Sequence, residues 1–429
     1  TSSIMIGDTT TGTIDAANYN TGVGVDVFAA LTTGDSNVAI GFEGLKDNTT
    51  GSNNVAIGSQ TVANNTTASS NVGIGTGALF TNTTGASNIA IGVQSLNANT
   101  TASNNTAIGH QSLLANTTGG QLVAVGAQAL DSNTTGGDNV AVGYEALGGN
   151  TTGSNNTAMG RNALLSNTTA SNNTALGFAA LAVNTTGADN VAVGKDAMAA
   201  TTTGGFNTAV GVDSLTTNTT GQSNVAFGVN ALLSNETGSN NVALGQQALQ
   251  ANTTADFNTA VGYQAGIANT TGASMVAVGS FALDANTTGG ANVAVGQNAI
   301  STNTTGSNNT GLGHRALRDS TTASNNTAVG YDALKVNTTG TSNTALGRES
   351  LDANTAGNNN TALGSRALGG NTNGEQNTAV GERALHNNTT ASNNVAMGYL
   401  ALLTNTTGAS NVAVGRGALQ LCTTGLNNV

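Results

Sequence analysis

The chain has 429 residues, of which 59 are Gly, none is Pro or Trp, and only 7% are charged. Globular proteins average about 25% charged residues, so the composition argues against an ordinary enzyme. The net charge of −11 excludes the basic surface of a duplex-DNA-binding protein and disfavours binding to anionic membranes. Hydrophobic residues reach 38% but aromatic residues only 3%, which predicts a narrow core of Ala, Val, Ile and Leu.

The N-terminal residues TSSIMIGDTT lack the basic start and the apolar stretch of a signal peptide. The first residue is Thr1, which suggests a processed or trimmed product. No run of eighteen apolar residues occurs, so we expect no membrane insertion. Cys422 is the single cysteine and is expected to be a small apolar residue rather than part of a disulfide.

A Gly recurs every seventeen residues along the whole chain. It stands at Gly7, Gly24 and Gly41 and then at each seventeenth position through to Gly415, which makes twenty-five repeats without an insertion or a deletion. Self-similarity at a fixed period is the signature of a repeat architecture. A coiled coil is excluded because seventeen residues do not fit the heptad spacing, and because Gly and β-branched residues are poor helix formers.

The three residues before each Gly are predicted to form a short strand, the first at residues 4–6. The residue directly before the Gly is apolar in all twenty-five repeats and is predicted to be buried. The middle residue is almost always Ala, with Gly73 and Gly311 among the exceptions, so its site admits only a very small side chain. In a strand, the middle residue points one way and its two neighbours point the other.

This alternation leaves two arrangements open. Either Ala lines a tight interior and its two neighbours form an apolar strip along the outside, or the neighbours fill the interior and Ala faces another chain or sheet. An apolar surface of that length is typical of an interface. Both arrangements therefore predict lateral self-association.

The residues after each Gly predict an anchor and a corner. A Leu stands four residues after the Gly in most repeats, and an Asn-Thr-Thr-Gly segment follows three residues later. Asn tolerates the left-handed backbone and bonds to its own backbone, so this segment is predicted to be a corner. A second Asn precedes most of the strands, as at Asn37 and Asn54. Side chains stacked at identical places are expected to form amide ladders that satisfy one another.

Two corners and two short extended runs per repeat predict an all-β fold, a β-solenoid (parallel β-helix or β-roll) of about 25 seventeen-residue rungs. We expect one domain over residues 1–429, with degenerate N-terminal repeats at 1–36, where Thr11 and Phe28 occupy the Leu site, and regular repeats at 37–429. Any open end of such a solenoid exposes strand edges. Ile4, Ile6 and Val429 occupy strand positions at the two ends, which predicts head-to-tail stacking into a filament. The alternatives are a fragment of a longer fibre, or capping by a separate protein.

The strand N-V-A-I-G at residues 37–41 and 54–58 resembles the repeat strand of trimeric autotransporter adhesin heads. Whole rungs such as NNTAVGYDALKVNTTG at residues 325–340 are similar to repeats of bacteriophage tail-fibre-like proteins and bacterial surface fibres. The resemblance covers all twenty-five repeats, although the longer repeat and the N-T-T-G corner depart from the adhesin heads. It implies a β-solenoid or β-roll, often a homotrimer, that serves attachment or reach outside the cell.

The sequence offers no converging set of catalytic or metal-binding residues. His110, His314 and His386 fall on widely separated rungs, and the acidic residues are scattered singly, whereas acid and base catalysis needs converging carboxylates. The Gly-rich calcium-binding repeat and the phosphate-binding loop with Lys are missing as well. We therefore expect no enzymatic activity, no metal and no cofactor.

The corner Asn formally satisfies the acceptor pattern for N-glycosylation, for example at Asn48, Asn82, Asn116 and Asn133. If sugar is attached at these positions, the rod is sheathed in glycan. The alternative interpretation is an Asn corner that satisfies the pattern without being modified.

These observations predict a structural protein, a subunit of an extracellular, cell-surface or virion-associated fibre that assembles laterally, for example as a trimer, or end to end. The alternative is an adhesin or tail-fibre segment that binds a cell-surface receptor or glycan, which should show an aromatic-rich patch. Tyr144, Tyr263, Tyr331 and Tyr399 are instead scattered, each one position after its Gly. Ice binding is a weaker third hypothesis, because the two adjacent Thr of the corner point to opposite sides and present one file per face.

Overall fold

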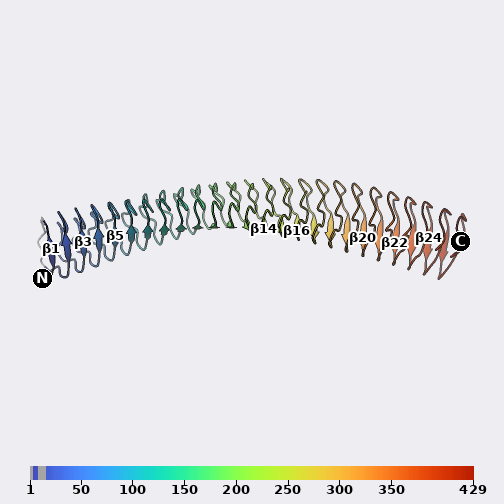
Figure 1. Ribbon diagram of the computed structural model, residues 1–429, viewed down its shortest axis with the longest axis horizontal. Helices are drawn as coiled ribbons and strands as arrows, with labels where there is room; N and C mark the ends of the chain where they lie inside the picture. Colours follow the sequence, from blue (N-terminus) through green and yellow to red (C-terminus); the bar gives the residue numbers. More distant parts are fainter. Residues whose placement is uncertain (1–2, 8–15) are drawn as a thin grey trace. The chain divides into compact units, whose positions relative to one another are not determined.

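The computed structural model describes residues 3–7 and 16–429, and its repeats form successive turns of a parallel β-solenoid with one short strand per turn (Figure 1). The chain divides into two compact units, unit 1 at Thr1–Asp213 and unit 2 at Ser214–Val429. Within the described ranges there is no α-helix, and hence no helix that could cross a membrane. The predicted all-β solenoid is confirmed, whereas the single domain over residues 1–429 stays a prediction. Thr11 lies outside the described residues.

Unit 1 contains thirteen described strands, and each pairs in parallel with the strand one turn away, in a register of seventeen residues. Their bounds are β1 Ile4–Ile6, β2 Thr21–Val23, β3 Val38–Ile40, β4 Val55–Ile57, β5 Val72–Ile74, β6 Ile89–Ile91, β7 Thr106–Ile108, β8 Val123–Val125, β9 Val140–Val142, β10 Thr157–Met159, β11 Thr174–Leu176, β12 Val191–Val193 and β13 Thr208–Val210.

Unit 2 repeats the same arrangement with twelve described strands. Their bounds are β14 Val225–Phe227, β15 Val242–Leu244, β16 Thr259–Val261, β17 Val276–Val278, β18 Val293–Val295, β19 Thr310–Leu312, β20 Thr327–Val329, β21 Thr344–Leu346, β22 Thr361–Leu363, β23 Thr378–Val380, β24 Val395–Met397 and β25 Val412–Val414.

The Gly that ends each strand is required by backbone conformation and by space together. Gly245, for example, has a φ of +141°, and a Cβ added there would lie 2.4 Å from the carbonyl oxygen of Gly262 on the next turn. Side-chain-bearing residues avoid this φ, and no carbon atom fits at such a distance. The unbroken seventeen-residue period of Gly follows from this close approach of successive turns.

The interior holds the Ala of each strand and the Leu four residues after the Gly. Ala243 and Leu249 are both fully buried, and their counterparts in the other regular turns are buried as well, except the half-buried Leu419 of the last turn. This decides between the two open arrangements, because Ala lines the interior and its neighbours face outward. The prediction that the residue before the Gly is buried is wrong. Leu244 is 38% exposed and Phe227 is 56% exposed, since their side chains stand on the outer face of the sheet.

Two files of buried Asn side chains run through the turns, which confirms the predicted amide ladders. In the corner file, Nδ2 of Asn65 donates to Oδ1 of Asn48 at 2.8 Å and to the carbonyl oxygen of Ala68 at 2.9 Å. In the file before the strands, the backbone N–H of Asn54 donates to Oδ1 of Asn37 at 2.9 Å. Each amide thus satisfies buried polar groups of its own turn and of the adjacent turn.

The Asn-Thr-Thr-Gly corner is present, but the residues with a left-handed backbone lie elsewhere in the turn. Asn48 is not among the residues with positive φ, whereas Glu43, Leu45 and Asn53, which stand two, four and twelve positions after Gly41, have φ values of 55°, 49° and 59°. Asn at the last of these positions suits the left-handed backbone, but Leu does not. Burial of the Leu side chain stabilises a conformation that local preference alone would not give.

Candidate functional site

The most extensive apolar surface is the outer face of the strands. We define the outer strip as the side chains of the first and third residues of each strand, which are Val, Ile or Thr followed by Val, Ile, Leu, Met or Phe. Most of these side chains are half-buried or exposed, for example Leu312 at 45% and Leu346 at 47%. The middle Ala faces inward, so only these two files reach the outer face.

The area of the outer strip is comparable to that of a protein interface. Strands lie about 4.8 Å apart and two outward residues span roughly 10 Å with their side chains, so each strand contributes about 50 Å². The twelve strands of unit 2 therefore present about 600 Å², and unit 1 presents a similar area. Soluble monomers rarely expose contiguous apolar patches larger than this.

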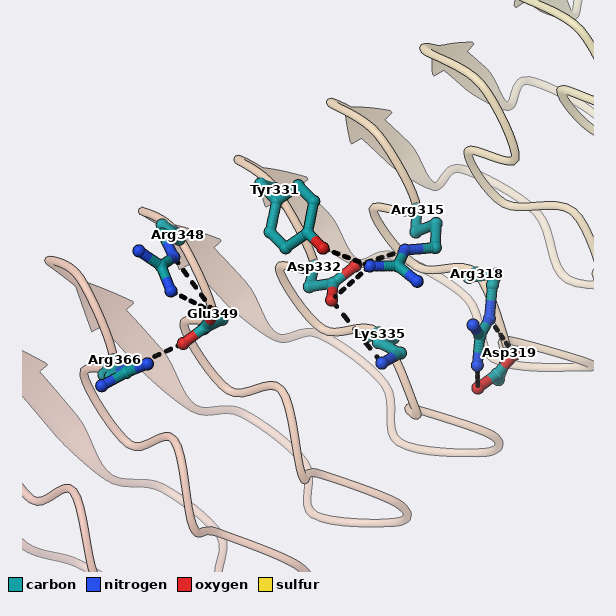
Figure 2. Close-up of polar contacts among 9 residues, drawn as sticks. All are labelled: Arg315, Arg318, Asp319, Tyr331, Asp332, Lys335, Arg348, Glu349 and Arg366. Atoms are coloured by element: carbon teal, nitrogen blue, oxygen red, sulfur yellow. Dashed lines mark hydrogen bonds and ion pairs between the residues drawn. The ribbon is translucent and has the colours of Figure 1, made fainter.

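The outer strip is bordered by a rim that contains many of the charged and aromatic residues of the chain. We define the rim as the first and second residues after the Gly that ends each strand. In unit 2, Figure 2 shows rim residues of neighbouring turns in contact: Nε of Arg315 lies 2.8 Å from Oδ1 of Asp332, and the same guanidinium contacts the Tyr331 hydroxyl. The Arg315 guanidinium carbon also lies 5.1 Å from the Tyr331 ring centroid, a cation–π geometry.

A second cluster of the rim in unit 2 is centred on Glu349. Its carboxylate accepts from Arg348 at 2.7 Å and from Nε of Arg366, on the next turn, at 2.5 Å (Figure 2). These two guanidinium groups lower the pKa of Glu349 below its ordinary value. Beyond the rim, Lys335 approaches Asp332 at 3.5 Å, and Arg318 pairs with Asp319 at 2.7 Å.

The four nominal glycosylation residues lie inside the solenoid. Asn48, Asn82, Asn116 and Asn133 are fully buried. Nδ2 of Asn82, the atom that would carry the sugar, donates to Oδ1 of Asn65 and to the carbonyl oxygen of Gly85. A glycan would remove one of these hydrogen bonds and would need space that the interior does not have. The folded turns therefore offer no room for sugar at these positions.

The three residues predicted to mediate end-to-end stacking are exposed. Ile4 and Ile6 are 61% and 60% exposed, and Val429 is fully exposed. No described contact tests stacking at these residues, so this association stays a prediction.

The histidine and tyrosine residues singled out from the sequence form no common cluster, although His314 and Tyr331 of adjacent turns are in contact. His314 stacks on Tyr331 with ring centroids 5.5 Å apart, and His386 Nδ1 lies 3.1 Å from the carbonyl oxygen of Arg366. Tyr144 lies against Arg161. Among the described residues, no group of three or more His, Cys, Asp or Glu side chains is placed to bind a metal.

The two corner Thr point to opposite sides, as predicted. The Thr49 hydroxyl donates to the carbonyl oxygen of Thr66 at 2.9 Å, whereas Thr50 is exposed. The corner thus presents a single exposed file of Thr.

Neither models of known protein families nor the curated proteins include a match to this chain. The candidate site is therefore argued only from the residues of this chain. Sequence reasoning identified the outer strip as one of two arrangements. The charged residues at the first two positions after the Gly are also visible in the sequence, but their contacts from turn to turn are not.

Proposed function

We propose that this chain is a structural subunit of a fibre outside the cell or on a virion, and that copies associate side by side through their outer strips. The observation that supports this most strongly is the outer strip itself, in which the third residue of every described strand is apolar and the first is Val, Ile or Thr. Burial of apolar surface stabilises association by about 25 cal/mol per Å² before the entropic cost of association. A strip of about 600 Å² per unit is close to the area that one partner buries in a stable complex.

The regularity of the strip also suits a fibre. Each outward side chain recurs one turn later in the same register, so one contact made between two copies can repeat along both. The resemblance to fibre repeats points to the same class of function. The proposed place, outside the cell or on a virion, rests on this resemblance.

The test places charge on the outer strip without touching the interior. The variant Leu244→Lys/Leu312→Lys/Leu346→Lys changes three exposed strip residues of unit 2. The matched control, Thr237→Lys/Thr305→Lys/Thr339→Lys, adds the same charge at exposed corner positions. Sedimentation velocity and electron microscopy of the unmodified protein should show laterally associated particles. The strip variant should be dispersed and the control should remain associated. Monomeric unmodified protein, or equal behaviour of the two variants, would overturn the proposal.

A further inference from the structure

The rim carries opposite net charge in the two units. Its charged members lie at the first or second position after the Gly, and all of them except the buried Asp332 are exposed or half-buried. In the described part of unit 1 they are five acidic residues and two basic residues: Asp26, Glu43, Glu145, Asp196, Asp213, Arg161 and Lys195. In unit 2 they are three acidic residues and five basic residues: Asp332, Glu349, Glu382, Arg315, Arg348, Arg366, Arg383 and Arg416. The rim is thus net negative in unit 1 and net positive in unit 2.

These charges lie close enough to the outer strip to influence what binds there. The rim begins two residues after the last strip residue of the same turn, which is about 7 Å along an extended chain. This separation is shorter than the Debye length of about 8 Å at physiological ionic strength. Contacts within the rim of unit 2 neutralise Asp332 and Glu349 with Arg315, Arg348 and Arg366 (Figure 2). Arg383 and Arg416 are exposed, as is Glu382, so the rim of unit 2 keeps a net positive charge.

We propose that side-by-side association places unit 1 of one copy against unit 2 of another copy. This inference rests on the proposed function, because the outer strips supply the area. Contact between two copies of unit 1 would place carboxylate-rich rims against each other, and like charges at an interface are strongly unfavourable. Contact between unit 1 and unit 2 pairs a negative rim with a positive one. Because each copy carries both surfaces, the contact can repeat from copy to copy and extend the fibre.

The first test measures which units lie together in the full-length chain. In a Cys422→Ser background, one population carries Ser59→Cys in the rim of unit 1 and another carries Ser365→Cys in the rim of unit 2. Donor-labelled and acceptor-labelled populations are mixed, and sedimentation confirms that they associate. Energy transfer should be high between labels at residues 59 and 365 of different copies, and lower for the two like pairs. Higher transfer for the like pairs in associated protein would overturn this inference and leave the proposed function standing. If the unlabelled protein does not associate, the proposed function itself is overturned.

The second test exchanges the charges of the rims. Variant P carries Arg348→Glu/Arg383→Glu/Arg416→Glu, and variant Q carries Glu43→Lys/Glu145→Lys/Asp196→Lys, so that both rims are negative in P and both are positive in Q. Each variant alone should associate at least about tenfold more weakly, and an equimolar mixture of P and Q should associate again. The control carries Glu at Thr237, Thr305 and Thr339, outside the rim, and should behave as the unmodified protein. Circular dichroism confirms that each variant is folded. Undiminished association of P and Q alone, or a mixture that stays dispersed, would overturn the inference.

Discussion

Gly311 lies against Ile300, and a Cβ added to Gly311 would stand 2.7 Å from Cγ1 of that side chain. The same relationship holds between Gly73 and Val62, where the distance from the added Cβ to Cγ2 would be 2.6 Å. In the other regular turns the strand residue is Ala, and in most of them its partner is Leu. A β-branched partner brings a carbon into the space that the Ala methyl group otherwise fills. Gly replaces Ala where the partner is β-branched.

This relationship predicts coupling between residues 300 and 311. Gly311→Ala alone should lower the free energy of unfolding by about 1–3 kcal/mol, because it overpacks the interior. In Gly311→Ala/Ile300→Leu, the two sites match the common pair and most of the loss should be recovered. Urea unfolding of the two single variants, the double variant and the unmodified protein gives the coupling energy. Additive effects of the two substitutions would show that the contact does not explain the Gly.

The corner ladder of unit 2 is interrupted at Ser320, and the interruption leaves polar atoms without partners. Oδ1 of Asn303, one turn earlier, is buried and receives no hydrogen bond, and the Ser320 hydroxyl is unpartnered too. At intact positions the following Asn donates to this oxygen, as Asn303 does to Asn286 at 2.7 Å. Ser320→Asn should therefore stabilise the protein by about 1–2 kcal/mol, because it completes the ladder. Thermal unfolding measures the shift.

Ser320→Asp is the matched control for this prediction. Its side chain has nearly the shape of Asn but no N–H group, so it offers Asn303 an acceptor instead of a donor. It should destabilise the protein, since it places a buried carboxylate against the unpartnered Oδ1 of Asn303. If Asn and Asp shift the melting temperature equally, shape rather than hydrogen bonding governs this site.

The period Gly should tolerate no side chain. In Gly245→Ala the new Cβ meets the carbonyl oxygen of Gly262, and the φ of +141° is unfavourable for Ala. We expect a loss of more than about 2 kcal/mol in the free energy of unfolding. The control is Gly290→Ser, at a position where the next turn has Ser307 and where an added Cβ lies 3.2 Å from the nearest atom. Denaturant unfolding should rank the control near the unmodified protein, and a Gly245→Ala variant of equal stability would contradict the close-approach argument.

The sequence was sufficient to predict the solenoid, its seventeen-residue turn and both amide ladders, because each depends on residues that recur at fixed positions. The counterparts of Asn37, Asn48 and Gly41 make the same contacts in most turns, so the period of these residues reflects the geometry of the turn. The orientation of the strand could not be predicted in this way. An apolar residue such as Leu244 recurs with the same period in the sequence whether its side chain packs in the interior or lies on the outer face.

The left-handed backbone of Leu45 was also beyond sequence reasoning. Local preference disfavours Leu at a φ of 49°, and only the packing of its side chain between turns explains the conformation. The net charge of the rim in each unit was not predicted for a different reason. The charged residues differ from turn to turn, and the division of the chain into two units, over which their charges are summed, is not visible in the sequence.

Asp284 is expected to make stability depend on pH. Burial raises the pKa of its carboxyl group from 3.8 to about 6, and its Oδ1 is buried without a hydrogen-bond partner. Well below pH 3.8 the group is protonated in the folded and unfolded chains alike, so it has no net effect. As the pH rises toward 6 the unfolded chain releases its proton first, and the folded state loses stability. Asp284→Asn removes this loss and should stabilise the protein at pH 7 by about 1–3 kcal/mol, with no gain at pH 3.5. The control Glu236→Gln, at an exposed corner position, should change stability little at either pH. Thermal unfolding at pH 3.5, 5 and 7 checks the prediction, and a gain from Asp284→Asn that is the same at all three values would refute the titration of Asp284 as its cause.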